Sequence, residues 1–138
     1  MTILIPSASE ATDLSFMLGA AVPGNQLLKL FVSNTTLADT TIASDLTEMS
    51  TLGYAAKTLT KTSWTVTAGA TGAAATAVYA AQTWTFTSGT AVTAYGYYVV
   101  DSTTGLLLWA ETFASAKVLQ NTGDTITITP TITASRSA

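Results

Sequence analysis

Apolar and hydroxyl side chains alternate near the end of the chain. Between positions 125 and 133, threonines fill every odd place, and isoleucine or proline fills every even place. Side chains of a β-strand point alternately to the two faces of a sheet, so Ile126, Ile128 and Ile132 share a face with Pro130. The pattern predicts a strand with one buried face and one face of exposed hydroxyls. Because proline cannot donate to a strand ladder, we expect this strand at a sheet edge, or with that position facing outward.

The N-terminal part of the chain has a helical period instead. Apolar residues follow the i, i+3, i+4, i+7 spacing of one helix face at Ala11, Leu14, Met17, Leu18 and Ala21. Ser7 and Glu10 have the spacing of a capping box. We therefore expect a short helix over residues 8–18, within an arm of residues 1–25. This arm either packs on the rest of the domain or docks on a neighbouring molecule.

From residue 26 onward the period is two, and turn-forming residues separate the apolar runs. Strands are expected at 27–33, 54–60, 63–67, 78–87, 92–101, 106–113, 116–120 and 125–133, with hairpin turns at 101–105 and 121–124. Residues 34–50 form a long polar connection, in which a helical turn over 42–49 points Leu46 and Met49 inward. Seven to eight short strands indicate an all-β fold, an antiparallel β-sandwich or barrel in a single domain of residues 26–138.

Two of these strands carry further information. Gly96 lies in the middle of the 92–101 strand, where glycine marks a bulge or a close backbone contact. Strict alternation places Tyr95 and Tyr97 on one face of that strand and Tyr98 on the other. The 106–109 segment has leucines on both faces, which predicts burial on both sides. We expect a second sheet to cover one side, and the N-terminal helix or another subunit to cover the other.

Charge is scarce over the whole chain. The 138 residues include 9% charged side chains, against about 25% in a typical domain, and the net charge is −3. Such a surface is prone to association unless neighbours cover it. Five cationic side chains are too few for nucleic-acid binding as a main role. The first six residues lack the features of a secretory signal, and no apolar run is long enough to span a bilayer. We therefore expect synthesis in a host cytoplasm and no membrane partner.

The chain contains neither cysteine nor histidine. Nucleophile–base pairs and metal sites built on these residues are therefore excluded. Carboxylate pairs remain: Asp45 with Glu48 one helical turn apart, Asp101 with Glu111 across a hairpin, or Asp101 with Asp124 as calcium ligands. We expect these groups to be solvated surface carboxylates, and we predict no catalytic residue, no cofactor and no metal site. The chain is not expected to be an enzyme.

The aromatic residues admit two interpretations. Trp64, Trp84 and Trp109 all lie in expected strands, where they would share one core. Alternatively, they form a sugar-stacking platform like those of carbohydrate-binding modules. Tyr95 and Tyr97 could similarly give an amphipathic surface for a partner subunit.

Several segments resemble a group of small virion proteins of tailed bacteriophages. They read LKLFVSN at 28–34, GYAAKTL at 53–59, YGYYVVD at 95–101 and LWAE at 108–111, with Asn121, Gly123 and Asp124 before the threonine–isoleucine strand. Together with the N-terminal helix they cover most of the chain. The resemblance implies a virion structural protein, most similar to capsid decoration (cement) proteins. These motifs are structural, and none of them is a catalytic signature.

The expected role is therefore to stabilise a phage head through contacts with capsid subunits. Its partners would be the major capsid protein and copies of itself, arranged as a trimer, and its location would be the virion. The candidate interface residues are Leu14, Met17, Leu18, Tyr95 and Tyr97. The alternative role is a component of the phage tail, baseplate or fibre, including a receptor- or glycan-binding module. Capsid or tail location is left open by the sequence.

Overall fold

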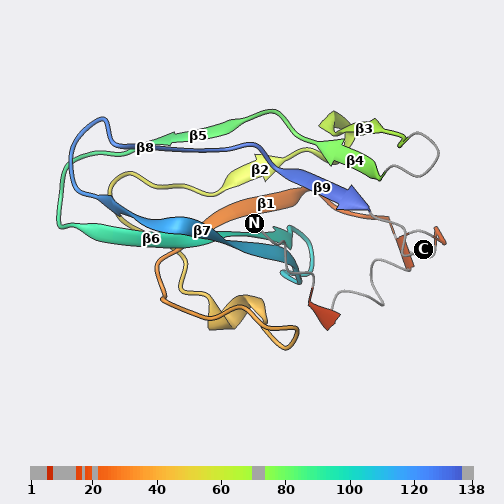
Figure 1. Ribbon diagram of the computed structural model, residues 1–138, viewed down its shortest axis with the longest axis horizontal. Coiled ribbons are helices and arrows are strands. Elements are labelled where there is room, and N and C mark those ends of the chain that lie inside the picture. Colours follow the sequence, from red (N-terminus) through yellow and green to blue (C-terminus); the bar gives the residue numbers. More distant parts are fainter. Residues whose placement is uncertain (1–5, 8–14, 17, 20–21, 70–73, 135–138) are drawn as a thin grey trace.

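The computed structural model describes residues 6–7, 15–16, 18–19, 22–69 and 74–134 (Figure 1). Within these ranges the named elements are β-strands and two short 3-10 helices, and only residues 7, 15 and 16 are α-helical, so the all-β prediction is confirmed. The strands are β1 (Gln26–Phe31), β2 (Lys57–Leu59), β3 (Thr65–Thr67), β4 (Ala75–Val78), β5 (Gln82–Thr85), β6 (Val92–Asp101), β7 (Leu107–Leu119), β8 (Thr125–Ile128) and β9 (Thr131–Ala134). The 3-10 helices are η1 (Ala43–Asp45) and η2 (Lys61–Ser63).

The described strands are nine, where seven to eight were expected. The expected 106–113 and 116–120 strands form one continuous strand, β7, although the ladder with β6 shifts register between Thr112 and Lys117. The expected 125–133 strand is divided at Pro130 into β8 and β9. The expected 78–87 strand is shorter, since β5 covers only Gln82–Thr85, and β4 begins at Ala75, before the expected start, and shares only Val78 with it.

All strand pairs are antiparallel, and they form three sheets. The largest has the order β2-β1-β6-β7, and the smaller two have the orders β3-β4-β9 and β5-β8. Both smaller sheets are built from the same two segments, one that contains β4 and β5 and one that contains β8 and β9. At the junction of the two sheets, the Tyr79 backbone N–H donates to the Pro130 carbonyl at 2.9 Å. Figure 1 shows β5 and β8 in one layer and β6 and β7 in another.

The threonine–isoleucine segment behaves as its pattern predicts. Ile126, Ile128 and Pro130 are buried, and the threonines at 125, 127 and 129 are exposed. Within the described ranges β8 pairs only with β5, and β9 pairs only with β4, so both lie at sheet edges. The proline is therefore accommodated at an edge, as expected.

A β-bulge in the ladder between β6 and β7 changes which side chains share a face. The pairing of β6 with β7 shifts register between Ala94 and Gly96. After this shift Tyr97 lies on the same side as Ala94, and Tyr95 packs on the opposite side with Tyr98. The prediction that Tyr95 and Tyr97 share a face is therefore wrong, because strict alternation along β6 does not continue across the bulge.

Gly96 is required at the bulge by close packing, as its position in the strand predicted. A Cβ atom at this position would collide with the Glu111 carbonyl oxygen and would lie 2.6 Å from the Phe31 ring. The backbone oxygen belongs to the paired strand and cannot move aside without disturbing the ladder. Glycine thus allows β1, β6 and β7 to pack tightly at this point.

The four-stranded sheet is buried on both faces. The inner face shares a core with the smaller sheets, in which Leu28, Val99 and Trp109 pack against Trp84 and Ile126. A second cluster lies on the outer face and consists of Phe31, Leu46, Tyr98, Val100, Leu107 and Ala110. The prediction that the 106–109 segment is buried on both sides is confirmed.

The 34–50 connection covers this outer face. Leu37, Ala43 and Leu46 from the connection contact the outer cluster, and η1 lies beneath the sheet in Figure 1. Among the described residues the connection supplies this cover, and most of the N-terminal helix that was expected there lies outside the described residues. Leu46 and Met49 point inward as predicted. Of the expected 8–18 helix, only Ser15, Phe16 and Leu18 are described, and the first two are helical.

We predict that Gly96→Ala lowers the free energy of unfolding by about 1–3 kcal/mol, because the added methyl group overpacks the bulge. Urea unfolding followed by tryptophan fluorescence measures this change. Ser115→Ala, at an exposed position of β7, is the control and should change stability by less than about 0.5 kcal/mol. Equal stabilities of the two variants would contradict the close-packing role of Gly96.

Candidate functional site

A cavity of about 420 Å³ lies where the edge strand β7 meets the edge strands β8 and β9. We call it the β7–β9 seam. Its lining consists of Tyr97, Glu111, Phe113, Thr127, Ile128, Thr129, Thr131 and Thr133. Hydroxyl groups, one carboxyl group and two aromatic rings therefore surround the same space.

Glu111 is the charged group of the seam. It is directly opposite Tyr97 in the ladder between β6 and β7, and it is only 5% exposed. The Tyr97 hydroxyl donates a hydrogen bond to Glu111 Oε2. Burial, followed by the hydrogen bond to Glu111, raises the pKa of Tyr97, so its hydroxyl keeps its proton and remains the donor. In the described part of the chain no ion pair involves Glu111, and no hydrogen bond reaches its Oε1 atom.

This arrangement is suited to binding a hydrogen-bond donor or a cation. A carboxyl oxygen in a poorly solvated site gains most from a donor that carries a positive charge. Phe113 lies beside Tyr97, with ring centroids 6.4 Å apart, and supplies an apolar wall. Glycoside hydrolysis uses two carboxyl groups about 5–10 Å apart, and Glu111 is the single acid of the seam lining. The described lining of the seam therefore lacks the second carboxyl group of that arrangement.

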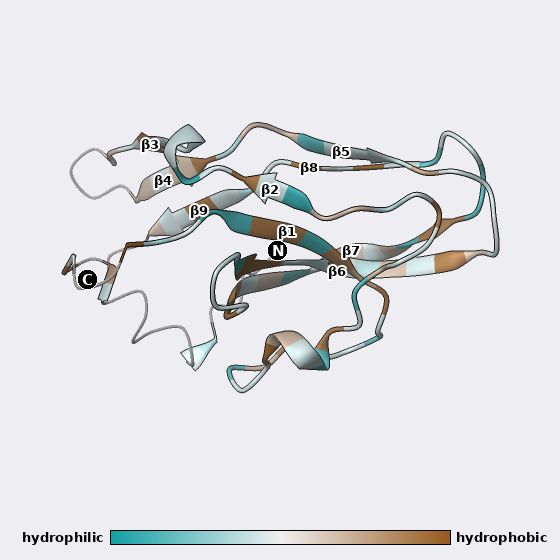
Figure 2. Ribbon diagram, turned by 180° about the vertical axis from the view of Figure 1, so that it is seen from behind, coloured by the Kyte–Doolittle hydropathy of each residue, from teal (hydrophilic) through white to brown (hydrophobic). Residues whose placement is uncertain are grey.

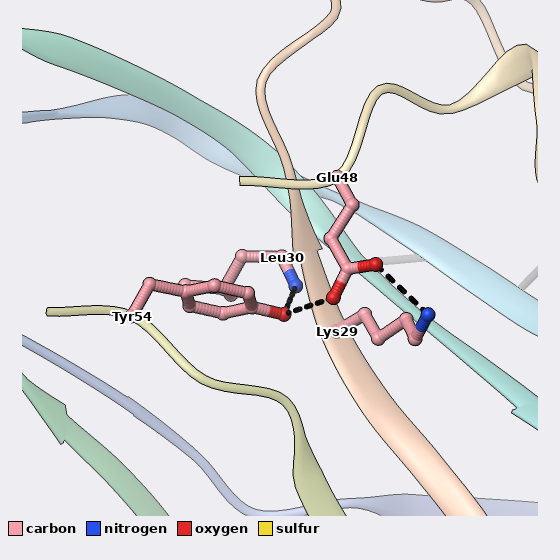
Figure 3. Close-up of polar contacts among 4 residues, drawn as sticks. All are labelled: Lys29, Leu30, Glu48 and Tyr54. Atoms are coloured by element: carbon pink, nitrogen blue, oxygen red, sulfur yellow. Dashed lines mark hydrogen bonds and ion pairs between the residues drawn. The ribbon is translucent and has the colours of Figure 1, made fainter. Parts of the chain in front are cut away.

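A separate polar network attaches the 34–50 connection to β1 (Figure 3). Lys29 Nζ lies 2.8 Å from Glu48 Oε2, and the Tyr54 hydroxyl donates to Glu48 Oε1 at 3.1 Å. The same hydroxyl accepts the Leu30 backbone N–H at 3.1 Å. The Tyr54 hydroxyl thus takes the place of a strand partner for β1 beyond the end of β2. Two carboxyl oxygens and one hydroxyl thus connect β1 to residues 48 and 54, about 20 positions later in the chain.

Tyrosines around this network are held in their protonated form. Burial is the main cause that raises the pKa of Tyr54. Burial, with a contribution from Glu48, raises the pKa of Tyr98 to about 12. Both hydroxyls therefore remain neutral over the physiological pH range.

The pair formed by Asp45 and Glu48 is not a helical pair. Asp45 ends η1 and accepts the Ile42 backbone N–H at 2.9 Å, as a local cap. Glu48 lies beyond η1 in an isolated bridge with Phe31 and is bound to Lys29. The prediction that the two carboxyls lie one helical turn apart is wrong, because η1 ends before Glu48.

Asp101 and Glu111 do not approach each other either. Asp101 Oδ1 accepts the backbone N–H groups of Thr103 and Thr104, and Oδ2 accepts that of Gly24 at 3.3 Å. Asp101 lies four residues along β6 from the partner of Glu111, a separation of roughly 13 Å in a strand. Asp101 therefore organises the turn between β6 and β7, and it is nearly fully buried there.

The expectation of solvated carboxylates is corrected for Asp101 and Glu111, which are both buried. Asp124 instead accepts the backbone N–H groups of Gln120 and Asn121, each at 2.8 Å, in the turn between β7 and β8. No group of three or more acidic, histidine or cysteine side chains converges within the described residues.

The tryptophans form part of the core. Trp84 and Trp109 are 3% and 5% exposed, and Trp64 packs beside Trp109 with ring centroids 6.0 Å apart. The shared-core interpretation is therefore confirmed. Stacking on a sugar requires an exposed ring face, so the alternative of a tryptophan platform is contradicted for Trp84 and Trp109.

The candidate interface residues lie in different environments. Leu14 and Met17 are outside the described residues, and Leu18 is 75% exposed. Tyr95 is half-buried against the outer cluster. Tyr97 is buried in the seam, so it does not provide the exposed contact surface that its sequence position suggested.

A comparison with models of known protein families finds no match, and a search of curated proteins also finds none. Among the described residues there is no helix whose length and apolar character would let it cross a membrane.

We predict that Tyr54→Phe lowers the free energy of unfolding by about 1–3 kcal/mol, because the Leu30 N–H and one Glu48 oxygen lose their shared partner. Chemical denaturation measures the loss. Tyr95→Phe is the matched control, since no hydrogen bond of the Tyr95 side chain is seen within the described ranges. Equal stabilities of the two variants would show that the Tyr54 hydroxyl does not hold the connection.

We also predict an acid-dependent contribution from Asp101. Burial alone would raise its pKa, but the hydrogen bonds, led by that from the Thr104 backbone, outweigh burial and lower the pKa. The carboxylate therefore stabilises the fold above the unfolded-state pKa of about 4, and this contribution is lost as the pH falls through the lower folded-state value.

Asp101→Asn should therefore be less stable than the wild type at pH 7, and it should lose less stability between pH 5 and pH 2. Urea titrations across this range test both points, with Asp39→Asn as an exposed control. If the free energy of unfolding falls equally with decreasing pH in the wild type and in Asp101→Asn, the role assigned to Asp101 is contradicted.

Proposed function

We propose that the chain is a non-enzymatic structural protein of a phage virion, which acts as a decoration protein that clamps capsid subunits. The observation that supports this most directly is the nature of the exposed strand faces, which present hydroxyl and methyl groups in place of charges. On β8 the exposed residues are threonines, and on β7 residues 114–118 are exposed with Lys117 as their one charged member. Figure 2 shows mostly pale or brown strands with short hydrophilic stretches.

An uncharged surface is favourable at a protein interface. Removing water from a charge costs several kcal/mol unless a partner compensates it, whereas hydroxyl and methyl groups are covered at much lower cost. Val66 and Val118 are 71% and 66% exposed on β3 and β7, and they add apolar area that a neighbour can cover. The resemblance to phage decoration proteins supports the capsid, and further copies of the chain in a trimer, as the partners at this interface.

The carboxyl groups support the same role. Asp45, Asp101 and Asp124 bind backbone N–H groups in turns, and Glu48 binds Lys29 and Tyr54. These groups stabilise the fold, which fits a protein that must persist in a particle.

The proposal can be tested on virions of the phage whose genome encodes the chain. We predict that gold-labelled antibodies decorate the head of intact virions and that the chain is present in amounts comparable to the capsid protein. Virions from a deletion mutant should lose infectivity faster than the wild type on heating and on osmotic shock. Complementation with the intact gene should restore the wild-type behaviour.

Two results would contradict the clamp. Deletion virions that survive heat and osmotic shock like the wild type would show that the chain does not stabilise the head. Labelling confined to the tail, with a few to dozens of copies per particle, would support the alternative of a tail, baseplate or fibre component.

A further inference from the structure

Both walls of the β7–β9 seam are sheet edges. Over the described ranges, β7 pairs only with β6, β8 only with β5 and β9 only with β4. Each of these strands therefore has one side without a strand partner, and backbone groups on that side are available for pairing. At 13 residues, β7 is the longest strand described. Long edges of this kind are templates for the addition of another strand.

The shape of the seam fits an extended chain. On the β8–β9 side its lining includes every second residue from Thr127 to Thr133. Seven residues of strand extend over roughly 20 Å, which is the length of a short peptide strand and far exceeds a single small ion. The threonine hydroxyls along this wall can donate or accept hydrogen bonds with such a chain.

Glu111 gives the seam a preference for charge. Its carboxyl group lines the cavity, is almost completely buried and has one oxygen without a hydrogen bond from the described residues. A strand that brought only apolar side chains next to Glu111 would remove its remaining water without replacing it. A strand that brought a lysine or arginine side chain would supply the missing donor and an opposite charge.

We propose that the seam binds an extended segment of a partner polypeptide, which adds as a strand to the β7 edge or the β8–β9 edge and places a lysine or arginine side chain on Glu111. This binding activity goes beyond the structural role proposed above. It is tested on the isolated protein, without a particle, so its failure is distinguishable from failure of the clamp.

The probes are heptapeptides Ac-Thr-Val-Thr-X-Thr-Val-Thr-NH2, in which X is lysine, arginine, norleucine or glutamate. Their affinities for the wild-type protein are measured by NMR titration. We expect the lysine and arginine peptides to bind about tenfold or more tightly than the norleucine peptide, and the glutamate peptide to bind most weakly. Amide hydrogen exchange should slow in residues 107–119 or 125–134 when the lysine peptide is bound.

Two variants test whether Glu111 causes the preference for the lysine peptide over the norleucine peptide. Glu111→Gln keeps an acceptor for the Tyr97 hydroxyl and should remove the preference for lysine over norleucine. Asp39→Asn makes the same change of charge at an exposed position outside the seam and should leave this preference unchanged. The comparison among peptides on the wild-type protein does not depend on the folding of either variant.

Three outcomes would overturn the proposal. The first is no binding of any peptide at millimolar concentration, and the second is equal affinity for the lysine and norleucine peptides. The third is binding of n-butylammonium as tight as that of the lysine peptide, which would show a small-cation pocket without strand addition.

Discussion

A β-bulge in the ladder between β6 and β7 determines which side chains reach each side of the main sheet. The bulge between Ala94 and Gly96 places Tyr95 outward, under the 34–50 connection, and Tyr97 inward, opposite Glu111. It also brings β1, β6 and β7 so close that a glycine is needed where they meet. The outer cluster, the inner core and the lining of the seam all depend on this local change of register.

The outer face shows how the fold replaces strand pairing where a strand ends. β2 pairs with β1 only along Gln26 to Leu28, which would leave the rest of β1 without partners on that side. The 47–49 segment occupies this side, because the Val32 N–H donates to the Thr47 carbonyl and the Met49 N–H donates to the Leu30 carbonyl. The Tyr54 hydroxyl satisfies the Leu30 N–H, and Lys29 fixes Glu48 in position. A long connection thus becomes part of the sheet and buries its outer face.

Periodicity predicted much of this fold, because alternation directly records which face of a strand is buried. The bounds of β6, the buried isoleucines of β8 and the inward positions of Leu46 and Met49 followed from it. The pairing of Tyr97 with Glu111 did not follow, because it depends on the register shift between Val99 and Val100, near the turn that joins β6 to β7. Gly96 was the available signal for the shift between Ala94 and Gly96, but a single glycine does not state how many residues of the facing strand leave the register. The shift between Val99 and Val100 has no comparable mark in the sequence.

The buried carboxyl of Glu111 has a physical explanation in the edges that surround it. An inward-facing charge beside a long free edge protects that edge from unintended strand addition, because an apolar strand would have to desolvate the charge. The same charge favours the one class of strand that can neutralise it, so protection and selectivity have a common origin. Replacing Glu111 with an apolar residue of similar volume would extend the inner core and remove both effects. A carboxyl group at position 111 therefore suits a strand, β7, that must remain unpaired until the correct partner segment binds.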